Sequence, residues 1–95
     1  MLSSEYQFKG VKMLYRILTE NKSKRDVLAI TSGYFDGFTV LEGQGYWKGK
    51  AEASLILEVE TTDLVSIKRL ANDIKLLNEQ EAILIECVSN SQFII

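Results

Sequence analysis

The chain has 95 residues, with no histidine and one cysteine. The absence of histidine removes the most common general base and the most common metal ligand. A zinc or other transition-metal site is therefore not expected, because such sites are built mainly from histidine and cysteine. Any chemistry must rely on carboxylates, tyrosine, hydroxyl groups, lysine and backbone groups. We expect neither a metal ion nor a cofactor.

The sequence also lacks a large excess of charge and any long apolar segment. The formal net charge is −2, so the basic surface that nucleic-acid binding requires is missing. No apolar run approaches the ~20 residues needed to span a bilayer. The first ten residues, MLSSEYQFKG, lack the basic start and apolar centre of a signal peptide. We expect a cytoplasmic protein that binds neither nucleic acid nor membrane.

The single cysteine, Cys87, lies in an apolar run and has no partner for an internal disulfide. It is interpreted as a small buried hydrophobic residue, which fits a reducing compartment. A hydrophobic fraction of 46% and a charged fraction of 25% are those of an ordinary globular protein. At this length the composition predicts one domain that covers residues 1–95.

The hydrophobic pattern predicts four strands and two helices. A helix over residues 6–19 is an alternative, but their β-branched and aromatic content favours a strand. A short apolar tail at 92–95 is a candidate edge strand. The predicted strands cover residues 6–19, 38–47, 53–61 and 82–88, and the predicted helices run from Ser23 to Gly33 or Gly37 and over residues 64–77.

Both helices begin at polar residues that are typical of helix caps. Ser23 is followed three residues later by Asp26, an arrangement close to a capping box. Thr62 or Asp63 is expected to cap the second helix, with Asp63 preferred. These start signals support the positions predicted for the two helices.

The order strand–helix–strand–strand–helix–strand predicts a ferredoxin-like α+β fold, with an antiparallel sheet and two helices on one face. The strands carry apolar residues on both faces, for example Leu55 and Leu57 on one and Ile56 on the other. Such a pattern indicates that the second face is also buried. We therefore predict a homo-oligomer, most simply a cyclic trimer whose sheets face inward.

Residues 36–60 contain the densest group of aromatic and polar side chains, and three glycines interrupt their strand pattern. A glycine inside a strand often marks a bulge or the close approach of a ligand. The candidate site residues are Gly43, Gly45, Tyr46, Trp47 and Glu52. The alternatives are a twisted hairpin for the glycines, a solvated strand start for Glu52, a half-buried position at a subunit interface for Tyr46, and an interface or core position for Trp47.

Glu58 and Glu60 lie two residues apart in the same strand. Two carboxylates at this spacing suggest acid–base chemistry of the glycosidase kind. The preferred interpretation is that both glutamates keep an edge strand soluble.

The segment GYWKGK, followed by ASLILEVET and by a helix that ends before EAILIE, resembles the PII/CutA-like group of trimeric ferredoxin-like proteins. Within this group the chain is similar to phage-encoded S-adenosylmethionine lyases. The likeness consists of a turn with Gly45, Tyr46 and Lys48, a glutamate that opens the third strand (Glu52), and an acidic–glutamine turn at residues 79–81.

The resemblance implies that the carboxylate of S-adenosylmethionine attacks its own γ-carbon, which gives homoserine lactone and methylthioadenosine without a general base. It implies that Glu52 binds the substrate ammonium and that Tyr46 positions the carboxylate or contacts the sulfonium region. It also implies that Trp47 stacks on adenine or faces the sulfonium, and that backbone amides near Gly43 and Gly45 approach the ligand.

The same resemblance implies a homotrimer with sites between subunits, acting in the cytoplasm of an infected bacterial host. A PII-like module that binds a nucleotide or metabolite without turnover is the alternative. A structural or inhibitory phage protein that acts by contact is a third interpretation.

Overall fold

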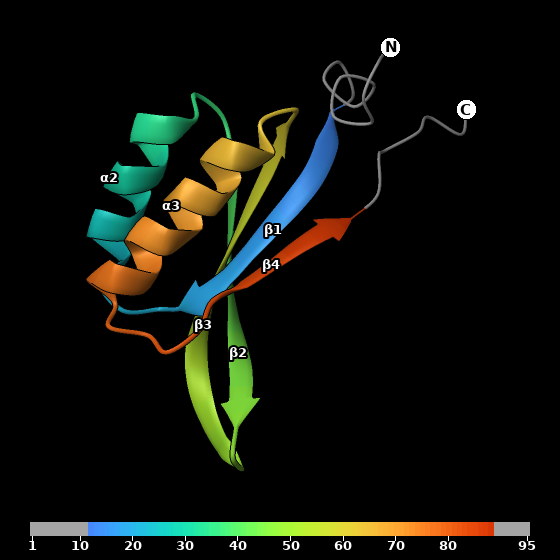
Figure 1. Ribbon diagram of the computed structural model, residues 1–95. Helices are drawn as coiled ribbons and strands as arrows, with labels where there is room; N and C mark the ends of the chain where they lie inside the picture. Colours follow the sequence, from blue (N-terminus) through green and yellow to red (C-terminus); the bar gives the residue numbers. More distant parts are fainter. Residues whose placement is uncertain (1–11, 89–95) are drawn as a thin grey trace.

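The computed structural model describes residues 12–88. Its elements are β1 (Met13–Glu20), α2 (Lys24–Tyr34), β2 (Thr39–Trp47), β3 (Lys50–Thr61), α3 (Leu64–Leu77) and β4 (Leu84–Val88) (Figure 1). The predicted bounds of the second helix are confirmed, whereas β3 begins three residues earlier and β4 two residues later than predicted. The predictions for residues 6–11 and 92–95 lie outside the described residues.

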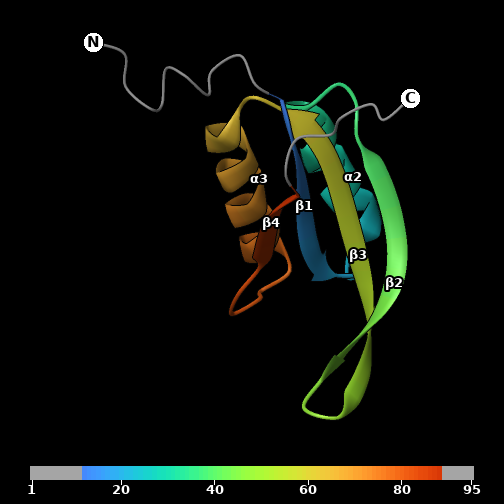
Figure 2. The same ribbon diagram turned by 90° about the vertical axis from the view of Figure 1, so that its right-hand side faces the viewer.

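The four strands form an antiparallel sheet in the order β2-β3-β1-β4. Both helices pack on one face of this sheet (Figures 1 and 2), so the predicted ferredoxin-like fold is confirmed. Side chains from β1, β3, α2 and α3 form the core between sheet and helices. Its buried members are Tyr15, Ile17, Val27, Leu55, Leu57, Val59, Ile67, Leu70, Ala71 and Ile74. Neither helix is long and apolar enough to cross a membrane.

The other face of the sheet, here called the open face, also carries apolar side chains. The strand register places Ile56 of β3 opposite Leu18 on one side and Leu41 on the other. No helix or strand within residues 12–88 covers this face, and Leu41 and Leu84 are 44% and 54% exposed. The predicted apolar character of both faces is therefore confirmed, whereas oligomeric assembly stays a prediction.

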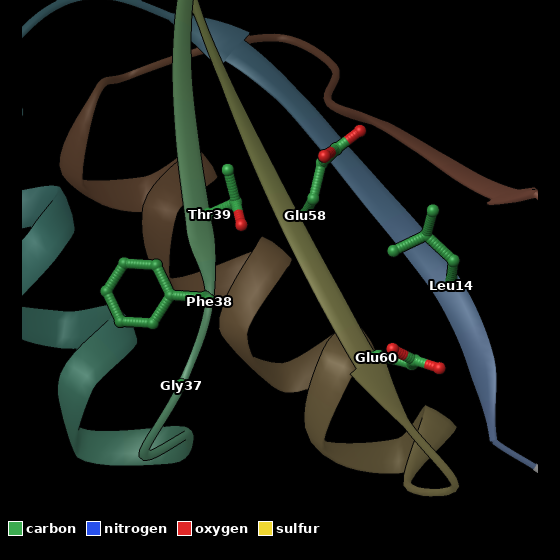
Figure 3. Close-up of a pocket in the computed structure, with 6 residues that line it drawn as sticks. All are labelled: Leu14, Gly37, Phe38, Thr39, Glu58 and Glu60. Carbon is green, nitrogen blue, oxygen red and sulfur yellow. The ribbon is translucent and has the colours of Figure 1, made fainter.

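The prediction that Glu58 and Glu60 lie on an edge strand is wrong. β3 lies between β2 and β1, and Glu58 is paired with Arg16 of β1, with 2.6 Å between Oε2 and Nε. The two glutamates and Leu14 border a hollow of about 260 Å³ at the end of the sheet where β2 begins (Figure 3). Residue alternation indicates which face a side chain occupies, but it carries no information on the order of strands.

The start of α3 confirms the predicted cap, and the start of α2 does not. Asp63 accepts hydrogen bonds from the backbone N–H of Ser66 at 2.9 Å and from its hydroxyl at 2.6 Å. Ser23 has a φ of 48° and makes no side-chain cap hydrogen bond, so the predicted capping box is wrong. Its backbone carbonyl instead accepts from the N–H groups of Asp26 and Val27, both at 3.0 Å.

Replacing Asp63 with alanine is expected to lower the free energy of unfolding by about 1 kcal/mol at neutral pH, because α3 loses its capping acceptor. The hydrogen bonds from Ser66 lower the pKa of Asp63 below its ordinary value of 3.8. The carboxylate therefore stabilises the fold above that value, and this contribution is lost as the pH falls through the lowered pKa. Denaturant unfolding at neutral and strongly acidic pH measures the effect. A pH-independent loss would contradict the role of the charge.

Cys87 is exposed, so the prediction of a buried cysteine is wrong. It lies opposite Tyr15 on β4, which has only one neighbouring strand, and within residues 12–88 no further element covers its side chain. Burial is the main cause that raises the pKa of Tyr15, and the neighbouring Cys87 raises it further. An apolar sequence run cannot distinguish an edge strand from a central one.

Candidate functional site

The β2–β3 hairpin extends beyond the rest of the sheet and twists strongly towards its tip (Figures 1 and 2). Lys48 and Gly49 form its two-residue turn with φ angles of 51° and 78°, the combination found in type I′ hairpin turns. The ammonium of Lys48 lies 5.9 Å from the centroid of the Trp47 ring, within the range of a cation–π contact. The turn thus places an aromatic and a basic side chain together at the tip.

The hairpin, the end of β1 and the loop between α3 and β4 border an open hollow of about 810 Å³, which we call the hairpin cleft. This volume lies within the range of small-molecule binding sites. Four of the five candidate residues line it, namely Gly45, Tyr46, Trp47 and Glu52. The cleft therefore joins the segment singled out in the sequence with two segments far from it along the chain.

Glu52 and Tyr46 reach the cleft from opposite sides of the hairpin. The register pairs Glu52 with Gly45 and Tyr46 with Ala51, and adjacent residues of a strand point to opposite faces. Glu52 is half-buried, whereas Tyr46 and Trp47 are 72% and 64% exposed. These exposures exclude a place for the two aromatic side chains in the core of a single chain.

Gly43 lies outside the lining of the cleft. A Cβ atom at this position would lie 3.4 Å from the hydroxyl of Ser54 and 3.7 Å from Cδ1 of Ile56. Both are ordinary van der Waals distances, so packing does not require a glycine here. A ligand role for Gly43 stays a prediction. Beside Gly45 the nearest such contact is 3.9 Å, to the carbonyl of Glu52, which leaves space for a ligand to approach.

Lys22 contributes a charge to the cleft that sequence reasoning missed. Its Nζ lies 2.9 Å from Oε2 of Glu20 and donates to the backbone carbonyl of Asn78 at 3.3 Å. The hydrogen bond with Glu20, and the nearby charges of Glu79 and Glu52, raise the pKa of Lys22. No local pattern in the sequence marks these residues, because they come from three segments that meet only in the folded chain.

A buried polar cluster attaches the loop after α3 to the end of β1. Asn78 is 3% exposed, and its Nδ2 lies 3.2 Å from the hydroxyl of Thr19 and 3.1 Å from Oε1 of Gln80. The Thr19 hydroxyl donates to the same Gln80 oxygen. Asn78 Oδ1 has no hydrogen-bond partner among the described residues. The cluster holds one wall of the cleft in place.

Glu79 adopts a strained backbone conformation at this wall. α3 ends with hydrogen bonds from the N–H groups of Gln80 to Lys75 at 3.0 Å and of Glu79 to Leu76 at 3.3 Å, the pattern of a Schellman motif. Glu79 has a φ of 53°, where glycine is preferred and another residue costs about 1 kcal/mol. Backbone conformations that a residue type rarely adopts are often found at functional sites, and Glu79 borders the cleft.

The lining of the cleft carries more negative than positive charge. It contains four glutamates and two lysines: Glu20, Glu52, Glu79, Glu81, Lys22 and Lys48. Tyr46 and Trp47 add exposed aromatic surface. This combination is suited to a cationic ligand that also carries an aromatic ring, and it disfavours a ligand with several phosphate groups.

The sequence matches no known protein-family model and no curated protein. Three solved structures resemble the fold. A phage SAM lyase in complex with S-methyl-5′-thioadenosine superposes with a TM-score of 0.66 at 14% identity, over 84% of this chain and 82% of that chain. A DUF3240-family protein from Shewanella baltica OS155 gives a TM-score of 0.63 at 12% identity, with coverages of 88% and 98%. A PII-like protein from Thiomonas intermedia K12, bound to ADP, AMP and bicarbonate, gives 0.60 at 11% identity, with coverages of 87% and 96%. The chain therefore shares its fold with a phage SAM lyase and with PII-like proteins.

Proposed function

We propose that the protein is an S-adenosylmethionine lyase and that the hairpin cleft is its active site. The observation that carries the proposal is the presence of Glu52, Tyr46 and Trp47 in one cleft with an excess of negative charge. S-adenosylmethionine has a sulfonium, an ammonium and an adenine ring, which match this lining. The fold shared with a phage SAM lyase supports the same assignment.

The proposed reaction needs no proton transfer. A carboxylate oxygen of the substrate forms a bond to the γ-carbon as the bond between this carbon and sulfur breaks, and the bonding pair remains on sulfur. The products are homoserine lactone and S-methyl-5′-thioadenosine. Holding the two reacting groups in line can contribute roughly 7–11 kcal/mol to the lowering of the barrier. This chemistry suits a chain without histidine.

Three of the candidate residues have a role in holding the substrate in its folded form. Glu52 binds the substrate ammonium and so fixes the amino-acid end. The Tyr46 hydroxyl positions the carboxylate or contacts the sulfonium region. Trp47 offers its ring to adenine or to the sulfonium, and a cation–π contact of this kind contributes about 0.5–2 kcal/mol.

We further propose that three copies assemble with their open faces inward. Leu18, Leu41 and Ile56 form an apolar surface there, and such a surface is stable in water when another copy covers it. Trp47 lies on the same face of β2 as Leu41, so its side chain then has a neighbouring copy as a second wall. The active sites lie between subunits in this assembly.

A PII-like module that binds a nucleotide without turnover is the second candidate. The fold of the PII-like protein bound to ADP and AMP favours it, whereas the negatively charged lining of the cleft disfavours it. A thermal-shift series distinguishes the two, because a ligand that binds the native state raises its melting temperature. Stabilisation by ADP or AMP, without cleavage of S-adenosylmethionine, would favour the sensor.

Incubation with S-adenosylmethionine is expected to yield S-methyl-5′-thioadenosine and homoserine lactone, detected by mass spectrometry. Decarboxylated S-adenosylmethionine is the matched control, because it lacks the attacking group and should remain intact. In water enriched in oxygen-18, the γ-oxygen of the product should stay unlabelled, whereas direct hydrolysis would label it. Unchanged substrate after long incubation with stoichiometric protein would contradict the proposal.

A further inference from the structure

The ammonium of Lys22 lies in the cleft at a place that also suits the ammonium of a cationic ligand. Its ammonium contacts the carboxylate of Glu20 and the carbonyl of Asn78, at 2.9 and 3.3 Å. Glu52 and Glu79 belong to the same cleft lining, and their negative charges raise the pKa of Lys22. The protein thus already holds one cation in the cleft whose Glu52 is proposed to bind the ammonium of the substrate.

We propose that Lys22 is a specificity-determining residue, which makes the cleft select ligands that carry an α-amino-acid head group over cations that have no carboxylate. This inference rests on the proposed function. The ammonium of the ligand replaces Nζ of Lys22 beside the carboxylates, and the displaced Nζ pairs with the carboxylate of the ligand. A cation without a carboxylate displaces the same lysine but offers it no new partner.

The chemistry of lysine permits this exchange. The side chain of Lys22 is 54% exposed, and its charge is carried by a flexible four-carbon stem. An exposed ion pair is worth little in water, so leaving Glu20 costs little. An ammonium acts as a point charge. It can hold one carboxylate oxygen of the ligand while the other remains free to attack the γ-carbon.

The test uses two uncleavable analogues of S-adenosylmethionine, in which a protonated tertiary amine replaces the sulfonium. One analogue has the α-carboxylate and the other lacks it. Isothermal titration calorimetry measures both dissociation constants for the wild type and for Lys22→Met. We expect the wild type to prefer the carboxylate-bearing analogue. In Lys22→Met this preference should fall by about 10-fold. The affinity for the carboxylate-bearing analogue should fall a few-fold, because it loses its ammonium partner. The affinity for the other analogue should rise a few-fold, because it no longer displaces a lysine.

Two further variants show whether the positive charge at this position is responsible. Lys24→Met removes an equal charge and an ion pair of 3.0 Å with Glu42 outside the cleft lining, and it should keep the wild-type preference. Lys22→Arg keeps the positive charge and should retain most of the preference for the carboxylate-bearing analogue. If the role of Lys22 is only structural, Lys22→Met would weaken the binding of both analogues equally and leave the ratio of their dissociation constants unchanged.

The outcomes separate this inference from the proposed function. An unchanged ratio in Lys22→Met, or an equal fall in Lys24→Met, would overturn the inference even if S-adenosylmethionine is cleaved. A lost preference in Lys22→Met, together with no cleavage by the wild type, would support the inference and overturn the lyase. Failure of both analogues to bind the wild type would overturn both.

Discussion

Glu52→Gln is expected to lower kcat/KM for cleavage of S-adenosylmethionine by roughly 10–100-fold, the range for loss of a hydrogen bond to a charged group. Glutamine preserves the size of the side chain but removes the charge that is proposed to hold the substrate ammonium. Glu52 is half-buried and faces the same cleft as Tyr46 and Trp47. Steady-state kinetics measure the effect, and sedimentation shows whether assembly is preserved.

Glu42→Gln is the matched control for this variant. Glu42 lies in the same hairpin but outside the cleft lining, and it pairs with Lys24 at 3.0 Å. The hydrogen bond from Lys24 lowers the pKa of Glu42, so the control also removes a paired charge. We expect Glu42→Gln to retain wild-type kinetics. Full activity of Glu52→Gln would show that another residue binds the amino-acid end of the substrate.

Ile56→Glu is expected to convert the proposed trimer into monomers and to abolish cleavage. Ile56 lies on the open face between Leu18 and Leu41, at the centre of the proposed contact between copies. An unpaired carboxylate buried in an apolar contact costs several kcal/mol, and a cyclic trimer would carry three of them. Sedimentation velocity of the wild type and the variant measures the change in mass.

Val65→Glu is the control for Ile56→Glu. Val65 is 58% exposed in the first turn of α3, on the helical side of the sheet, where a glutamate interacts favourably with the helix dipole. It should leave both assembly and stability unchanged. A monomeric wild type would overturn the trimer.

The elements of the fold were predicted well where their signals are local. The hydrophobic pattern of residues 64–77 predicted α3 with its observed bounds, and Ile67, Leu70 and Ile74 on this helix are buried. Asp63 was identified as the cap from its own first turn. The equally local capping signal at Ser23 was wrong, because Ser23 has a φ of 48° and its side chain makes no cap hydrogen bond. Predictions that depended on neighbours across the sheet, such as the burial of Cys87 and the edge position of Glu58, were wrong.

The candidate site was predicted only in part. Glycines and aromatic residues near the tip of the hairpin marked Gly45, Tyr46, Trp47 and Glu52, which line the cleft. Gly43 belongs to the same motif but lies outside the lining of the cleft, opposite Ser54. The opposite wall, with Lys22, was missed.

The sequence alone determined the types and order of the elements, the apolar character of both sheet faces, and the absence of histidine from any reaction. Hydrophobic periodicity, turn residues and composition are properties of short segments, so they can be read without the fold. Only the tertiary structure decided that β3 is internal and that Lys22, Glu52 and Glu79 share one cleft. Strand pairing and packing bring together residues far apart in the chain, and no local pattern records which of them meet.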